Sequence, residues 1–369
     1  MSLHPSLIKE YLLGVQGYKG GKAAVAKPGQ KVYKLSSNEN PLGPSPKAVE
    51  AIKRAANDLH IYPDNTPQRL YDALGAYYKD LDESNFVAGN SGSEMIELLM
   101  TAFIREGDEI IVSSPSFLPY QMFGKWRGAH IKDVPLKSPD FSLDVEGILG
   151  AITEKTRLIF LTSPNNPTGT YIPKQQLDHI IASVPDHLIV VIDEVYYRFA
   201  DADDYTTALP YVLDGKPVIG INSFSKSYGL AGMRLGYMYT TSEIAAYIRT
   251  VVRPFLINSI SLSAAVAALE DEEWVEDLAN LVKEQKERIY PVLNELDIRY
   301  WDTQGNFVLV EPEMGEIPFS EALFSEGIMT RPVSSFGAPG CVRITIGDEE
   351  ATDALIAALR RVLNEAPID

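Results

Sequence analysis

The sequence predicts an α/β protein with two domains: a large one whose mostly parallel central sheet is sandwiched by helices, and a smaller α+β one. Its 369 residues are too many for one simple core. Short apolar runs that end in polar residues are typical of strands buried on both faces of a parallel sheet. Helical segments alternate with these runs, as α/β sheets require.

The first expected elements are helices. Ser45 can cap a helix over residues 46–59, and Pro46 suits its first turn. Residues 66–80 predict a second helix. The runs read as central strands are residues 109–112, 158–161, 188–192, 218–221 and 236–239.

The remaining elements predict the smaller domain. A helical stretch over residues 242–296 contains Pro254 and Pro291, so we expect it to be broken or kinked at both. Apolar runs at 307–310, 327–330 and 342–346 and a terminal helix follow. The Gly-rich residues 1–37 predict a flexible arm. We expect the large domain to cover residues 38–255, and the small domain to combine 1–37 with 256–369.

Composition excludes several classes of partner. The net charge of −17 argues against nucleic acid and anionic membranes, although a local arginine cluster can still bind a small anion. The single cysteine, Cys341, excludes an internal disulfide, suits a reducing cytoplasm and lies in an apolar stretch typical of a core. The polar start lacks a signal peptide, and no apolar stretch approaches the ~20 residues of a spanning helix. The five histidines show no metal-site spacing, so we predict no metal, and the cysteine usage predicts a cytoplasmic protein.

Four polar segments follow apolar runs, where open α/β sheets bind ligands. Residues 89–94 (Gly-Asn-Ser-Gly-Ser-Glu) have capping-box spacing between Ser91 and Glu94, so a helix begins there. Its free N–H groups at Gly92 and Ser93 suit a phosphate, although capping alone also explains the pattern. Residues 163–169 (Ser-Pro-Asn-Asn-Pro-Thr-Gly) form a rigid turn that can also aim an amide at a ligand.

The other two segments carry charges. Asp193 ends an apolar run, where it is either a solvated strand end or a buried carboxylate that needs a cationic partner. Residues 223–236 (Ser-Phe-Ser-Lys-Ser-Tyr-Gly-Leu-Ala-Gly-Met-Arg-Leu-Gly) place Lys226 between hydroxyls and eight residues before Arg234. Such a lysine can form a carbonyl adduct beside an anion site, whereas most lysines are only surface residues.

In this order and separation, the segments resemble the fold type I aminotransferases that depend on pyridoxal 5′-phosphate, in particular the histidinol-phosphate aminotransferase family with its aromatic-aminotransferase relatives. The resemblance runs from residues 36–43 (Ser-Ser-Asn-Glu-Asn-Pro-Leu-Gly) to Arg343, roughly four-fifths of the chain. Ser-x-Ser-Lys with its downstream Arg, Asn-Pro-Thr-Gly and Asp-Glu-x-Tyr are together highly specific.

The resemblance implies a role for each matching residue. Lys226 would hold the cofactor as a Schiff base and then move the proton, while Asp193 would keep the ring nitrogen protonated. Asn166 and Tyr196 would bind the phenolic oxygen, and Phe117, otherwise a core aromatic, would stack on the ring. The phosphate would be held by Ser223, Ser225, Arg234 and the backbone of Gly92 and Ser93. Tyr62 resembles the tyrosine that reaches this phosphate from the neighbouring subunit, which implies a homodimer.

The substrate side is implied in the same way. Arg343 resembles the arginine that grips the substrate's anionic group, Arg331 resembles a second phosphate-gripping arginine, and Asn38 would lie near the substrate; a surface salt bridge is the plain alternative for each arginine. The segment at 91–94 lacks the aspartate usual in the family. The arm also departs from the family pattern, which leaves open whether Tyr11 or Tyr18 touches substrate.

Four functions are compatible with this motif set. We expect transamination between histidinol phosphate and 2-oxoglutarate in histidine biosynthesis, because two arginines suit a phosphate dianion. An aromatic amino-acid aminotransferase would use Arg343 for a carboxylate. A phosphothreonine decarboxylase shares much of the motif set. A regulatory module that only binds the cofactor is disfavoured, because the chain before the fold is too short for a DNA-binding domain.

Overall fold

The computed structural model describes residues 4, 8–13 and 29–364. Its largest sheet has seven strands in the order β2-β8-β7-β6-β5-β3-β4. Neighbouring strands from β4 to β7 run parallel, whereas β8 is antiparallel to both β2 and β7. The strands are β2 (Phe86–Gly89), β3 (Glu109–Val112), β4 (His130–Asp133), β5 (Thr156–Thr162), β6 (Ile189–Asp193), β7 (Val218–Ser223) and β8 (Gly236–Tyr239).

Both faces of this sheet are buried under helices. On β5, Ile159 and Leu161 belong to one apolar cluster, while Leu158 and Phe160 belong to another on the opposite face. The first cluster includes residues of α2, α6 and α9, and the second includes residues of α3, α4 and α8. The helices are α1 (Pro46–Ala55), α2 (Gln68–Tyr78), α3 (Gly92–Phe103), α4 (Pro119–Trp126), α5 (Val145–Ala151), α6 (Lys174–Ser183), α7 (Leu209–Leu213), α8 (Ser242–Arg249) and α9 (Ser259–Leu269).

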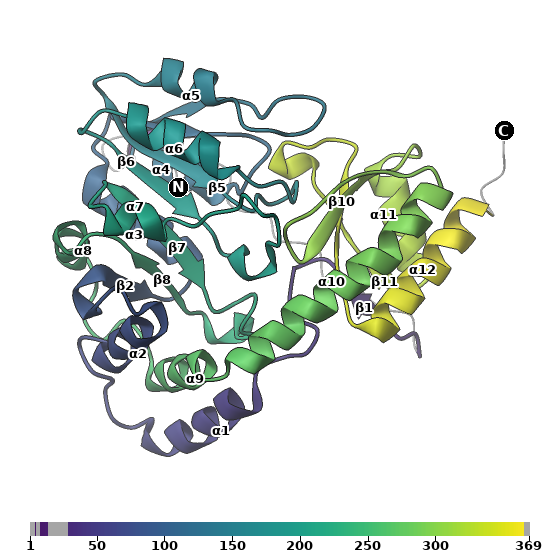
Figure 1. Cartoon of the computed structure of the whole chain (residues 1–369), viewed down its shortest axis with the longest axis horizontal. Helices are drawn as coiled ribbons and strands as arrows, with labels where there is room; N and C mark the ends of the chain where they lie inside the picture. The colour runs from purple at the N-terminus through teal and green to yellow at the C-terminus, as the bar shows by residue number, and fades with distance from the viewer. Residues whose placement is uncertain (1–3, 5–7, 14–28, 365–369) are drawn as a thin grey trace.

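A second, antiparallel sheet has the order β12-β13-β10-β9. The long helix α10 runs from the large sheet towards this smaller body, where α12 lies beside it (Figure 1). The N-terminal strand β1 pairs in parallel with β11, so the arm joins the smaller body. The elements are β1 (Tyr33–Lys34), α10 (Glu272–Glu295), β9 (Arg299–Trp301), β10 (Phe307–Glu311), α11 (Glu316–Ser325), β11 (Ile328–Met329), β12 (Arg331–Pro332), β13 (Val342–Thr345) and α12 (Glu349–Asn364).

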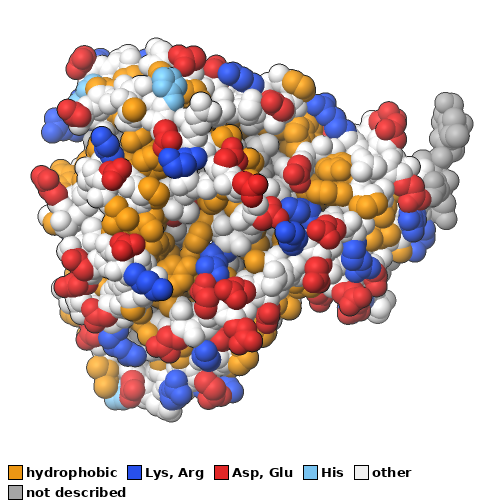
Figure 2. All heavy atoms as spheres, in the orientation of Figure 1, with side chains coloured by type: hydrophobic (Ala, Val, Ile, Leu, Met, Phe, Trp, Pro, Cys, Tyr) orange, Lys and Arg blue, Asp and Glu red, His pale blue; other side chains and the backbone are white. Residues whose placement is uncertain are grey.

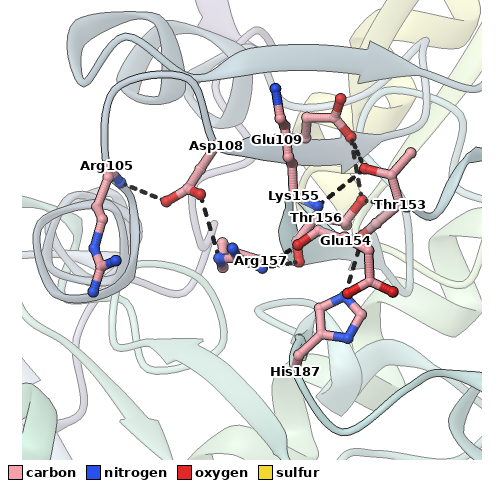
Figure 3. Close-up of polar contacts among 9 residues, drawn as sticks. All are labelled: Arg105, Asp108, Glu109, Thr153, Glu154, Lys155, Thr156, Arg157 and His187. Atoms are coloured by element: carbon pink, nitrogen blue, oxygen red, sulfur yellow. Dashed lines mark hydrogen bonds and ion pairs between the residues drawn. The ribbon is translucent and has the colours of Figure 1, made fainter.

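Polar contacts link the residues at the amino-terminal ends of β3 and β5 with the loop before β6 (Figure 3). Asp108 and Arg157 form an ion pair at 3.3 Å, and the Thr153 hydroxyl donates to the Glu109 carboxylate at 2.6 Å. His187 Nε2 lies 3.1 Å from the Thr153 carbonyl oxygen. Charged side chains of both signs are interspersed over the face seen in Figure 2. Among the described residues, no helix is long and apolar enough to span a membrane.

The structure tests several of the expectations for these elements. The run at 236–239 forms a strand, but β8 is antiparallel, because only the short segment 224–235 joins it to β7. The break near Pro254 is confirmed, and α10 continues through Pro291 without a break, while a kink there stays a prediction. Glu287, whose carbonyl loses its donor to Pro291, is exposed, so water can satisfy that oxygen. The turn between α9 and α10 was not predicted.

The domain boundary at residue 255 stays a prediction. Helix α9 follows this boundary in the chain, yet it packs against α1 and α2 beside the large sheet. Cys341 is buried, as its apolar neighbours predicted. The arm's glycines at positions 14, 17, 20 and 21 lie outside the described residues.

Candidate active site

A cavity of about 510 Å³ opens at the carboxyl ends of the central strands. It collects side chains from the large sheet and from β12 and β13 of the small one. Twelve of the fourteen candidate residues line it: Gly92, Ser93, Phe117, Asn166, Asp193, Tyr196, Ser223, Ser225, Lys226, Arg234, Arg331 and Arg343.

Asp193 is the last residue of β6 and is buried. Its Oδ2 accepts a hydrogen bond of 2.6 Å from the Tyr120 hydroxyl, and its Oδ1 lies 3.4 Å from the Val195 nitrogen. Burial raises the pKa of Asp193 to about 6, and these two donors offset only part of that effect. The carboxylate therefore stands at a position where a protonated ligand nitrogen would stabilise it.

The raised pKa of Asp193 has a consequence for stability without cofactor. The folded carboxyl keeps its proton up to a pH of about 6, whereas the unfolded one loses it near 3.8, so stability falls as the pH rises between these values. Asp193→Asn removes this cost. We expect its unfolding free energy, relative to wild type, to increase by roughly 2 kcal/mol from pH 4 to pH 7 in urea titrations of cofactor-free protein. A difference that stays constant with pH would contradict the raised pKa.

Lys226 follows β7 and is enclosed by the cavity wall. Its Nζ donates a hydrogen bond of 3.0 Å to the Ser37 carbonyl oxygen. Burial is the main cause that lowers the pKa of Lys226 to about 7; the charges of Arg343 and Arg234 act in the same direction, and Glu39 opposes them. A large share of Lys226 is therefore neutral near pH 7, which is the form that attacks a carbonyl carbon.

The wall of the cavity at the start of α3 is suited to an anion. Helix α3 begins here, with the Ser91 hydroxyl accepting from the Glu94 nitrogen at 3.2 Å, so the N–H groups of Gly92 and Ser93 lie at the positive end of the helix dipole. The expected capping box is only half formed, because the Glu94 carboxylate accepts from the Asn90 nitrogen and not from Ser91.

The segment after β7 completes this anion site. Ser223, Ser225 and Arg234 all reach the cavity. The backbone of Arg234 is left-handed at φ 52°, and its Nη1 donates to the Ala231 carbonyl at 2.9 Å. A Cβ on Gly236 would lie 2.4 Å from the Gly92 nitrogen, so glycine allows β8 to start directly against α3.

The small sheet contributes two arginines to the opposite wall. Arg331 on β12 and Arg343 on β13 are direct cross-strand partners. The guanidinium of Arg343 is buried and donates to the Asn166 side-chain oxygen at 2.5 Å and to the Ser36 carbonyl at 2.7 Å. Both guanidiniums face the ring of Phe336, at 5.5 Å for Arg331 and 5.9 Å for Arg343.

Two candidate residues do not line the cavity. Asn38 lies behind the cavity-lining Tyr196, to whose hydroxyl its side-chain nitrogen donates at 2.9 Å. Tyr62 is 82% exposed, and its ring lies 5.2 Å from that of Phe255 beside a separate hollow. Tyr11 belongs to a short helix that packs against α4 and does not line the cavity, and Tyr18 lies outside the described residues.

The sequence did not single out several of the residues that line the cavity. Tyr120, which bonds to Asp193, lies in the first turn of α4 shortly after Phe117, and the two rings are in contact with centroids 5.7 Å apart. Ser36, Ser37 and Glu39 flank Asn38 in the first motif and also line the cavity. Thr162 and Phe336 carry no comparable signal in the sequence.

This donor set fits a phosphorylated pyridine that bears an aldehyde. One cavity is surrounded by three kinds of group. They are the buried acid Asp193, the partly neutral amine of Lys226, and the start of α3 with two serines and an arginine. These groups match the ring nitrogen, aldehyde and phosphate respectively.

Fold and site together define a transferase of the class that binds an aldehyde cofactor between a lysine and a buried acid. The sequence pattern of the family described as aminotransferase class I and II matches residues 30–359, and the chain belongs to that family. Similar relatives are histidinol-phosphate aminotransferases from Akkermansia muciniphila (38% identical, 90% of each chain covered) and Halalkalibacterium halodurans (35%, 97% of each).

Solved structures give the same result. The histidinol-phosphate aminotransferase of Sinorhizobium meliloti, in complex with pyridoxal-5′-phosphate, has a TM-score of 0.82 at 25% identity, with 91% of this chain and 92% of that one covered. The enzyme of Clostridium acetobutylicum has a TM-score of 0.82 at 27% identity, with 90% and 99% covered.

Proposed function

We propose that this chain, with pyridoxal 5′-phosphate bound, transfers the amino group of histidinol phosphate to 2-oxoglutarate, yielding imidazole acetol phosphate and glutamate in histidine biosynthesis. The names of its relatives support this substrate. The cavity supports it as well, because the residues around it match each part of the cofactor.

The bound cofactor would supply an aldehyde that takes up the donor amine and a ring that withdraws electrons from the reacting carbon. Asp193 would hold the proton on the ring nitrogen. The freed amine of Lys226 would remove the proton from the amine-bearing carbon of the donor and deliver it to the cofactor. Tyr196 and Asn166 would hydrogen-bond the phenolic oxygen while Phe117 stacks on the ring.

The observation that carries the choice of substrate is the arginine pair on β12 and β13. Like charges directly across a strand pair repel one another, so an arrangement with both guanidiniums at one cavity favours a doubly charged anion between them. A phosphate monoester is such an anion, whereas an amino-acid carboxylate carries one charge. The hydrogen bond between Arg343 and Asn166 supports an anion site next to the proposed ring site.

A donor panel tests this assignment. Histidinol phosphate should convert the bound cofactor rapidly from its aldehyde to its amine form, and phenylalanine and tyrosine slowly. Arg331→Gln should raise KM for histidinol phosphate by about 10- to 100-fold, the value of one charge-assisted bond, while conversion of phenylalanine changes little. Arg299→Gln, at an exposed arginine on β9, is the matched control.

Each other outcome of the panel identifies a different reaction. Faster conversion by phenylalanine or tyrosine would mean an aromatic amino-acid aminotransferase. Release of carbon dioxide from phosphothreonine would mean a decarboxylase. Cofactor binding without conversion by any donor would mean a binding module.

We also propose that the active unit is a homodimer. Leu59, Ile61, Tyr62 and Phe255 are large apolar residues that are each at least 48% exposed, and two of them border a hollow of about 340 Å³. Such exposure favours coverage by a second copy of the chain, which would carry Tyr62 to the partner's phosphate site. The buried single cysteine and the composition support a cytoplasmic location.

Mixed dimers test the exchange of Tyr62. Tyr62→Ala and Lys226→Ala should each be nearly inactive alone. A mixture refolded together should regain activity, because one site of each mixed dimer then has both Lys226 and the partner's tyrosine. Mixtures that stay inactive although ultracentrifugation shows mixed dimers would contradict this role of Tyr62.

A further inference from the structure

Asn38 lies in a left-handed turn between β1 and α1, with φ at 54° and 1% of its surface exposed. Asparagine is among the few residues that adopt this conformation readily. Its polar groups all meet buried partners. The carbonyl accepts from the Asn306 side chain at 3.2 Å, and the other contacts are with Thr345 on β13 and Tyr196 after β6.

The contacts with Thr345 fix which way the Asn38 amide points. The Asn38 backbone N–H donates to Thr345 Oγ1 at 2.9 Å, and the Thr345 hydroxyl donates to Asn38 Oδ1 at 3.2 Å. An amide's oxygen and nitrogen have nearly the same shape, and a hydroxyl can meet either; here the Thr345 oxygen already accepts from the Asn38 N–H, and its own hydrogen gains an acceptor when Oδ1 faces it. With Oδ1 directed at Thr345, Nδ2 faces the Tyr196 hydroxyl at 2.9 Å.

The direction of the Tyr196 hydrogen follows from this arrangement. An amide nitrogen only donates, so the Tyr196 oxygen accepts from Asn38, and the single hydrogen of that hydroxyl cannot point at Asn38. Tyr196 itself lines the cavity. We propose that Asn38 is a positioning residue that makes Tyr196 a hydrogen-bond donor towards the cavity, and so towards the phenolic oxygen of the bound cofactor. This inference rests on the proposed function.

The same contacts link the small sheet to the cofactor site. Arg343 and Thr345 lie two residues apart on β13 and so share one face of the strand. One of them bonds to Asn166, and the other orients the amide that meets Tyr196. The strand that would bind the substrate's anion thus also sets both proposed partners of the phenolic oxygen.

The test is the pH midpoint of the visible absorbance of pyridoxal 5′-phosphate linked to Lys226. A donor to the phenolic oxygen weakens that oxygen's hold on the proton of the linkage, so loss of the donor raises the midpoint. Asn38→Gly, which tolerates the left-handed turn, should raise it, and Asn38→Asp should raise it further, by about 1 pH unit, because a carboxylate accepts the Tyr196 hydrogen. Thr345→Val should raise it in the same direction.

Tyr196→Phe provides the control, because the two uncharged substitutions, Asn38→Gly and Thr345→Val, should cause no further shift in that background. Shifts that add to that of Tyr196→Phe, or an unchanged midpoint in all three variants while the linkage forms, would overturn the role of Asn38 and leave the proposed function standing. A wild-type protein that forms no such linkage would overturn both.

Discussion

Replacing Lys226 with Ala is expected to lower kcat by at least about 10⁴-fold, because the substitution removes both the nucleophile and the proton carrier. The fold should persist, since deleting a lysine whose pKa is lowered mainly by burial leaves no charge without a partner. Cofactor affinity should fall only in part, because the phosphate and ring contacts remain. Single-turnover spectra with histidinol phosphate and near-ultraviolet circular dichroism measure these effects.

A second lysine provides the control for this prediction. Lys216 is exposed two residues before β7, and Lys216→Ala should retain wild-type turnover. Transamination by Lys226→Ala at the wild-type rate would show that another group carries the proton.

Asp193→Ala should lower kcat by about 10³-fold, because it removes a charge interaction that strengthens as electron density moves into the ring. KM should change less, since the phosphate and anion contacts of the cavity stay in place. Steady-state kinetics with saturating cofactor separate this loss from weaker cofactor binding.

The neighbouring carboxylate is the matched control. Glu194 is also buried, but its oxygens accept from Tyr239 at 2.6 Å, from Asn222 at 3.0 Å and from the Ala208 nitrogen at 2.8 Å. Glu194→Gln should therefore lower stability and change kcat by less than about threefold. A larger loss of kcat in Glu194→Gln than in Asp193→Ala would mean that the wrong carboxylate was assigned to the ring nitrogen.

Much of the fold could be predicted because its strongest signals are local. Continuous apolar runs such as 158–161 and 188–192 identified the central strands, since only a sheet covered on both faces buries every side chain of a strand. β4 gave no such signal, because its pattern at the sheet edge is largely exposed or intermediate. The direction of β8, antiparallel to both β7 and β2, is not visible in its apolar pattern, which looks like that of the parallel strands.

The cavity-lining residues were predictable where they follow a strand or belong to a compact motif. Lys226, Asp193 and Asn166 follow this pattern. Arg331 and Arg343 on the second sheet also line the cavity, but they were named from the family resemblance and not from such a pattern. Asn38 was expected near the substrate, but its amide is turned towards Tyr196 by Thr345, more than 300 residues away in the chain. Tyr62 is exposed to solvent in this chain, and its proposed contact would lie across a subunit interface.

The measurement that tests this account most directly is reduction of the protein with borohydride after incubation with pyridoxal 5′-phosphate, followed by mass spectrometry of its peptides. The cofactor's mass should be fixed to Lys226, with exposed lysines such as Lys216 unmodified at equal cofactor and protein concentrations. A colourless protein whose peptide containing Lys226 keeps its unmodified mass would contradict it.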